Sequence, residues 1–171
     1  MSTTRKSDPL LTITQLLLRI GMALLALGIA LAAGAVIALI LVPDQQLLPR
    51  LSTDGTLGLV IAGAALCALM MALYLYFVLN LSRIVATVGT GDPFQPENAD
   101  RLSRMAWLTV ALQVCMFGFA PLVTMIADRI GKPGGGIDLT FDGLVLALVL
   151  FVLARVFRLG TQMRDDLEGT V

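Results

Sequence analysis

The sequence predicts an all-α polytopic membrane protein, with four transmembrane helices in an antiparallel bundle and helices that extend into the cytoplasm. Of its 171 residues, 57% are hydrophobic and only 14% are charged, a balance that soluble domains rarely have. Charge-free runs cover residues 20–42, 56–81 and 105–127, and each reaches the roughly 20 residues that cross a bilayer as a helix. A fourth, shorter apolar run follows near the C-terminus.

These runs place the spans at 15–42, 56–81, 104–127 and 139–158 within a single membrane domain that covers 1–171. The first run is longer than the apolar region of a signal peptide, about 7–15 residues, so we expect an uncleaved anchor. The uncharged part of the fourth run, 143–154, lies between Asp142 and Arg155. It crosses most of the hydrocarbon if Arg155 extends its guanidinium to the headgroups.

The distribution of basic residues predicts the orientation. Nine Lys and Arg residues lie on the side of the termini and the middle loop, and three lie on the other side. By the positive-inside rule, both termini, the loop 82–104 and the tail 159–171 are cytoplasmic. We expect Arg19, Arg155 and Arg158 at the membrane boundary, where the last two contact lipid phosphate or a carboxylate. The candidate carboxylates are Asp92, Glu97, Asp165 and Asp166.

The middle loop carries the signals of a helix start. Asp92 suits an N-cap before Pro93, Gln95 holds the capping-box position, and Pro96 fits the first turn of a second start. The third helix is therefore expected to begin well outside the membrane. The second helix is expected to continue to Gly89.

Two acidic residues stand four positions before arginines, the favourable orientation for ion pairs on a helix surface. These pairs are Glu97 with Arg101 and Asp100 with Arg104. The fourth helix is expected to continue to about residue 167. Three helices would then project into the cytoplasm together.

The composition points away from most chemistry. There is no His, and Cys67 and Cys115 lie inside apolar runs, so we expect no metal, no cofactor and no disulfide. The net charge is zero, which gives no basic field for direct nucleic-acid binding. The charge-free parts of the spans hold no carboxylate for proton transport or catalysis, so we expect no enzyme. Gln113 is expected to form an interhelical hydrogen bond rather than line a polar path.

Two other features of the spans have alternative interpretations. Small residues recur every four positions in the first two spans, as at Gly28 and Ala32. They favour packing inside one bundle, with a homodimer as the alternative. Gly118 with Pro121 favours a static kink over a hinge in the third span.

The strings GDPFQPENADRLSRMAW (91–107) and FRLGTQMRDDLEGTV (157–171) resemble the bacterial family catalogued as domain of unknown function 2975. The likeness covers essentially the whole chain, although many relatives end in an Asp-Leu-Thr-Val-like sequence that this tail lacks. The resemblance implies a four-span protein of the bacterial inner membrane. Members are often encoded beside a very small helix-turn-helix regulator of the Cro/repressor type, which implies such a partner.

We therefore expect a non-enzymatic membrane regulator that binds or sequesters a small helix-turn-helix transcription factor at its cytoplasmic face. The alternative is a small transporter, channel or stress-related membrane component. Helix capping does not require an aromatic residue such as Phe94 at the loop tip. Its presence therefore favours partner contact over capping alone. The expected partners are therefore membrane lipid and this transcription factor. The transcription factor would contact a surface of eight residues. They are Asp92, Pro93, Phe94, Glu97, Asn98, Asp165, Asp166 and Glu168.

Overall fold

The structure is a computed structural model that describes residues 9–41, 55–90, 93–131 and 137–168. These residues form four α-helices: α1 (Pro9–Leu41), α3 (Thr56–Thr90), α4 (Pro96–Arg129) and α5 (Asp142–Glu168). Each helix is long and apolar enough to cross a membrane. The predicted all-helical, four-span fold class is thus confirmed.

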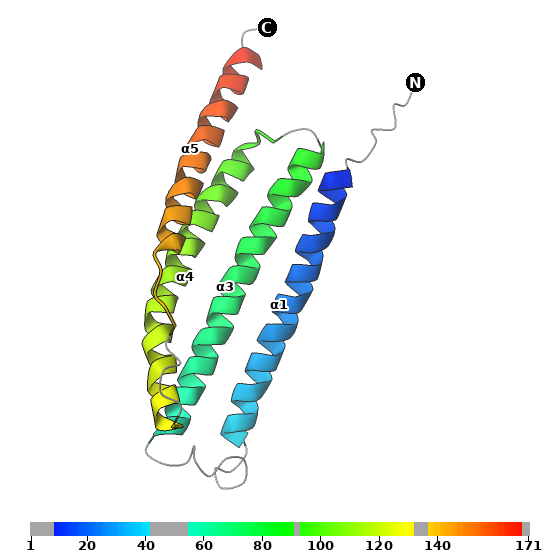
Figure 1. Ribbon diagram of the computed structural model, residues 1–171. Coiled ribbons are helices and arrows are strands. Elements are labelled where there is room, and N and C mark those ends of the chain that lie inside the picture. The colour runs from blue at the N-terminus through cyan, green and yellow to red at the C-terminus, as the bar shows by residue number, and fades with distance from the viewer. Residues whose placement is uncertain (1–8, 42–54, 91–92, 132–136, 169–171) are drawn as a thin grey trace.

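The helices run antiparallel to their chain neighbours and pack mainly against them, in the order α1, α3, α4, α5 (Figure 1). One end of the bundle holds the start of α1, the end of α3, the start of α4 and the end of α5. We call it the turn end, and the opposite end the far end. Because α1 contacts mainly α3, and α5 contacts mainly α4, the two outer helices leave much of their apolar surface exposed.

The helices are longer than a bilayer requires. With 33, 35 and 34 residues, α1, α3 and α4 each measure about 50 Å, against about 30 Å of hydrocarbon. Since α3 continues to Thr90 and α4 begins at Pro96, both project beyond their charge-free runs at the turn end. Helix α5 projects there too, because it continues to Glu168.

The best-buried part of the bundle lies where α3, α4 and α5 meet. Its buried side chains come from all three helices, and partly buried aromatic rings pack around them. The buried set is Ile84, Leu102, Met105, Ala106, Leu150 and Ala154. Ala106 and Ala154 let the helices approach closely, and the larger side chains stabilise the contact by van der Waals packing, since lipid is as apolar as the side chains themselves.

Some small residues serve helix packing as the sequence suggests. The Met71 side chain of α3 lies against Gly28 of α1, and Leu122 and Ile126 of α4 lie against Gly63 of α3. Gly34, in contrast, has no side chain near it among the described residues. Packing within one bundle therefore accounts for Gly28 and Gly63.

Gln113 forms the hydrogen bond that its burial requires. Its Nε2 donates to the backbone carbonyl of Thr140, at 2.6 Å, just before α5. Its Oε1 lies against Gly143, where a Cβ would collide with it. Gln113 thus joins α4 to the start of α5, which confirms the structural interpretation of this amide.

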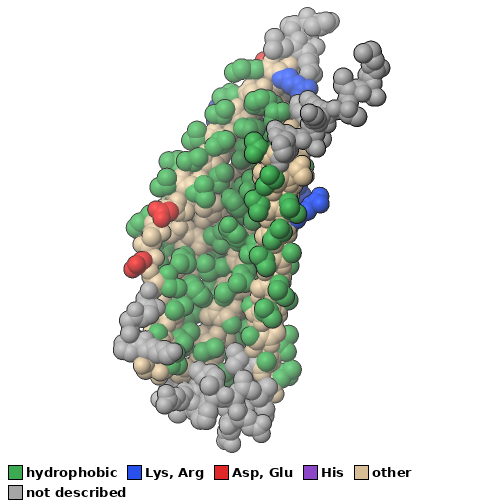
Figure 2. All heavy atoms as spheres, turned by 45° about the vertical axis from the view of Figure 1, so that its right-hand side comes forward, with side chains coloured by type: hydrophobic (Ala, Val, Ile, Leu, Met, Phe, Trp, Pro, Cys, Tyr) green, Lys and Arg blue, Asp and Glu red, His purple; other side chains and the backbone are tan. Residues whose placement is uncertain are grey.

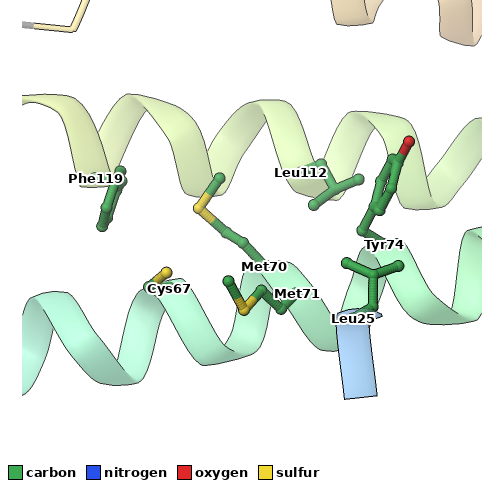
Figure 3. Close-up of a pocket in the computed structure, with 7 residues that line it drawn as sticks. All are labelled: Leu25, Cys67, Met70, Met71, Tyr74, Leu112 and Phe119. Carbon is green, nitrogen blue, oxygen red and sulfur yellow. The ribbon is translucent and has the colours of Figure 1, made fainter. Parts of the chain in front are cut away.

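Apolar side chains cover the outer faces of the helices along most of their length (Figure 2). Between α1, α3 and α4 this surface is hollowed into a groove of about 280 Å³ (Figure 3). Cys67, Met70 and Met71 of α3 line it together with Leu112 and Phe119 of α4. The thiol and thioethers therefore lie among apolar neighbours, as fillers of irregular packing.

Candidate functional site

The candidate site is the turn end, and its local structure begins with the short segment before α4. Residues 93–95 are not helical, and α4 starts at Pro96. Gln95 is the N-cap, but its side chain makes no capping hydrogen bond. The backbone N–H of Asn98 donates to the backbone carbonyl of Gln95, with the nitrogen and oxygen 2.9 Å apart. The helix start expected at Pro93 is wrong, because the proline that occupies the first turn is Pro96.

Asn98 fixes this segment to both neighbouring helices. Its side chain is fully buried, and Nδ2 donates to the Pro93 carbonyl at 2.9 Å and to Thr87 Oγ1 at 2.7 Å. Its Oδ1 accepts from Arg101 Nη1 at 2.7 Å. Asn98 was expected on the partner surface, but its side chain is not on the surface at all. Its amide instead holds the segment, α3 and α4 together.

Phe94 docks the same segment onto α5. Its ring lies on Gly160, and it contacts the Phe157 ring with centroids 5.4 Å apart. Thr161, a buried residue of α5, places its hydroxyl 3.0 Å from the Phe157 carbonyl and 3.4 Å from that of Phe94. A side chain at position 160 would displace the ring. Phe94 is nevertheless 44% exposed, so part of the ring remains available at the surface.

The ion pairs differ from those expected within α4. Asp100 contacts Arg158 of α5, with Oδ1 and Nη2 3.4 Å apart, and Arg101 donates to Asn98. Antiparallel packing brings α5 beside the first turns of α4. Asp100 therefore pairs with an arginine of α5 instead of with Arg104 on its own helix. A carboxylate partner for Arg158 was expected; it is Asp100, which was not among the candidates. Both side chains are at least half exposed, so this pair contributes at most about 1 kcal/mol.

A recess of about 280 Å³, with a mixed polar and apolar lining, opens between α4 and α5 at this end. Its wall on α4 includes Pro96 and Asp100, and its wall on α5 includes Arg158, Thr161 and Gln162. The recess therefore combines a carboxylate, a guanidinium, a hydroxyl and an amide. It is suited to contacts with a polar ligand or a protein side chain.

Of the remaining expected contact residues, the structure describes the side chains of Pro93, Glu97 and Asp166, and none of these three lines the recess. Pro93 is half-buried, and Glu97 and Asp166 are exposed. Asp92 and the side chains of Asp165 and Glu168 lie outside the described residues. In the part of the chain that the structure describes, no three potential metal ligands of the His, Cys, Asp or Glu type lie together.

Four arginines, one from each helix, lie at nearly one level below the recess. Their level follows from contacts between neighbouring helices: Leu11 lies beside Gly89, and the rings of Trp107 and Phe151 meet. Counting along the helices from these contacts, and from the Asn98 bond to α3, places all four within about one turn. We call them the arginine belt: Arg19, Arg83, Arg104 and Arg155, all exposed.

The arginine belt sets how the bundle can sit in a bilayer. Moving four arginines into hydrocarbon would cost roughly 2.5 kcal/mol or more each, about 10 kcal/mol together. This cost supports the prediction that Arg19 and Arg155 lie at the membrane boundary. Arg158 lies one turn further out than Arg155, so a bundle placed with the arginine belt at the membrane boundary would have the recess and Phe94 outside the hydrocarbon.

Several residues that shape the site carry no sequence signal strong enough to identify them. Gly160 and Thr161 lie in the polar C-terminal part of α5, within the string that carries the family resemblance, but only the packing of α5 on residues 93–95 gives them a role. Gln162 lines the recess but follows from no motif. To identify these residues from the sequence, one would need to know the antiparallel register of α4 and α5, which places Phe94 opposite Gly160.

Comparisons with known proteins place the chain in a family. The family model described as protein of unknown function (DUF2975) matches residues 41–171, which is most of the chain, so the protein belongs to this family. Neither the curated proteins nor the solved structures gave a match.

Proposed function

We propose that this member of the DUF2975 family is a non-enzymatic regulator of the bacterial inner membrane, whose turn end faces the cytoplasm and binds a small helix-turn-helix protein. The observation that supports the proposal best is the recess between α4 and α5, which is lined by both polar and apolar groups. It stands on the outer side of the arginine belt, and the hydroxyl of Thr161, one of its lining residues, lies 3.4 Å from the carbonyl of Phe94, whose ring is partly exposed. A recess beside an exposed aromatic residue suits a protein contact.

The charges around the recess suit such a partner only in part. Asp100 is already paired with Arg158, and Glu97 is exposed at the start of α4. An acidic surface that competes with phosphate for a basic protein is therefore not the main support. The proposal rests instead on shape and on the mixed polar lining, with Glu97 as an added attraction for a basic side chain.

A transporter or channel is the alternative, and Gln113 is the residue on which it would depend. The amide nitrogen of Gln113 is held by the Thr140 carbonyl, and its Oε1 lies against Gly143. Helix packing therefore accounts for both ends of this side chain. No specific feature of the described residues favours the alternative over the regulator.

The proposal is tested by filling the recess without disturbing the packing of the turn. Phe94→Ala is a poor choice, because the ring also docks residues 93–95 onto α5. Gln162→Trp places a large side chain at the recess, and Met163→Trp places it one position further on, where the native side chain is 63% exposed. Each tagged protein is purified from its native bacterium in mild detergent, and co-purifying proteins are identified.

We expect a small helix-turn-helix protein with the wild type and with Met163→Trp, and at least a tenfold smaller amount with Gln162→Trp. Equal thermal stability of the two Trp variants shows that the loss does not come from misfolding. If the wild type brings down no helix-turn-helix protein, the proposed partner is wrong. If Gln162→Trp retains it fully, the recess is not the contact surface.

A further inference from the structure

Helix α5 is much shorter than its neighbours on the membrane side of the arginine belt. From the belt to the far end, α1 continues for 22 residues beyond Arg19, and α4 for 25 residues beyond Arg104. These lengths correspond to about 33 and 38 Å, enough to cross the hydrocarbon. Helix α5 has only 13 residues from Arg155 back to Asp142, about 20 Å.

The chain before α5 runs beside α4 without forming a helix. Figure 1 shows α5 beginning well above the lower ends of α3 and α4, with the segment 137–141 rising alongside α4 to reach it. Two contacts fix this path: Gln113 donates to the Thr140 carbonyl, and the rings of Phe117 and Phe141 lie 5.8 Å apart. Non-helical backbone therefore lies at the depth of the apolar middle of α4.

This segment is also polar and exposed. Asp138, Thr140 and Asp142 are exposed, and so is Leu139. Backbone groups outside a helix, and carboxylates, need water or protein partners, and lipid-exposed irregular segments do not occur within hydrocarbon. Sliding the bundle to bring Asp142 out of a bilayer of ordinary thickness would also move α1, α3 and α4. The arginine belt would then enter the hydrocarbon.

We propose that the far leaflet is locally thinned at the α4–α5 edge, so that water and lipid headgroups reach the segment 137–142. The rest of the bundle meets a bilayer of ordinary thickness. The thinning of the bilayer is thus confined to one edge of the protein. It follows from the mismatch between a short α5 and three longer helices, and it is independent of any partner at the turn end.

The test compares two exposed positions at one level on opposite edges of the bundle. Phe141 is 61% exposed beside α4, and Leu31 of α1 is 66% exposed. Leu31 lies one turn beyond Gly28, which packs on Met71 of α3. Closer to the far end of α3, Leu66 packs on Gly118 of α4, the residue after Phe117. Counting from these contacts puts Leu31 within about one residue of the level of Phe117 and Phe141.

Single cysteines are introduced as Phe141→Cys and Leu31→Cys in a background with Cys67→Ser and Cys115→Ser. The proteins are reconstituted in vesicles of phosphatidylethanolamine and phosphatidylglycerol, with a charged maleimide on both sides, so that insertion direction does not matter. Because the reagent needs a hydrated thiolate, we expect Phe141→Cys to react at least tenfold faster than Leu31→Cys. Leu139→Cys, in the same segment, provides a second reporter that leaves the Phe117 ring contact intact.

Slow reaction of both Phe141→Cys and Leu139→Cys, at the Leu31→Cys rate, would overturn the proposal, since the segment would then lie in hydrocarbon. Fast reaction of all three would also overturn it, because the whole far end would stand outside the bilayer. Labelling of unfolded protein in detergent confirms that each thiol is intact.

Discussion

Asn98→Ala is expected to lower the free energy of unfolding by about 3 kcal/mol. The substitution removes a fully buried amide together with its bonds to Thr87, Pro93 and Arg101. Each buried polar group that loses its partner costs about 1–3 kcal/mol. The effect should appear as a lower midpoint of thermal unfolding in detergent.

Glu97→Ala is the matched control for this prediction, because it truncates the preceding, exposed residue of the same helix turn. We expect it to change the stability by less than about 0.5 kcal/mol. Asn98→Asp keeps an acceptor for Arg101 but loses both donated hydrogen bonds, so it should be nearly as harmful as alanine. Wild-type stability of Asn98→Ala would show that the segment before α4 is held by other contacts.

Replacing both Arg155 and Arg158 by Leu is expected to reduce the amount of correctly inserted protein several-fold. The uncharged part of α5 would then extend from Gly143 to Met163, and nothing on this helix would fix it at the level of the arginine belt. Asp100 would also lose its partner, and two of the nine orienting charges would be gone. The measurement is the yield in washed membranes, with thermal stability after purification.

Arg155→Lys with Arg158→Lys is the control, since lysine keeps the charge and can also extend to the headgroups. It should insert at the wild-type level. Unchanged yield and stability in the double Leu variant would show that neither arginine anchors α5.

Much of the fold could be predicted because hydrocarbon imposes a simple requirement. Charge-free runs of sufficient length indicate α1, α3 and α4, and the proline and acidic residues around Pro96 indicate that α4 begins outside the membrane. Gln113 was correctly assigned to an internal hydrogen bond, since a buried amide needs partners. These predictions depend only on local composition and on the cost of burying polar groups.

The details of the candidate site depend on how distant helices align, and composition does not determine that alignment. Asn98 reads as a surface residue of a polar loop, but the packing of α3 on α4 buries it. Asp100 has Arg104 four residues away in the sequence, whereas the structure brings Arg158 to it. The shortness of the fourth apolar run was evident, but the non-helical path of residues 137–141 beside α4 was not, because it depends on contacts with Gln113 and Phe117.

The orientation of the turn end tests the central claim most directly, because a regulator that holds a transcription factor must present its contact surface to the cytoplasm. Fluorescent protein and alkaline phosphatase are each fused after Val171, following α5, in a Gram-negative host. The excess of basic residues at this end predicts a fluorescent fusion and an inactive phosphatase. An active phosphatase with a dark fluorescent fusion would place the recess outside the cytoplasm and contradict the proposed function.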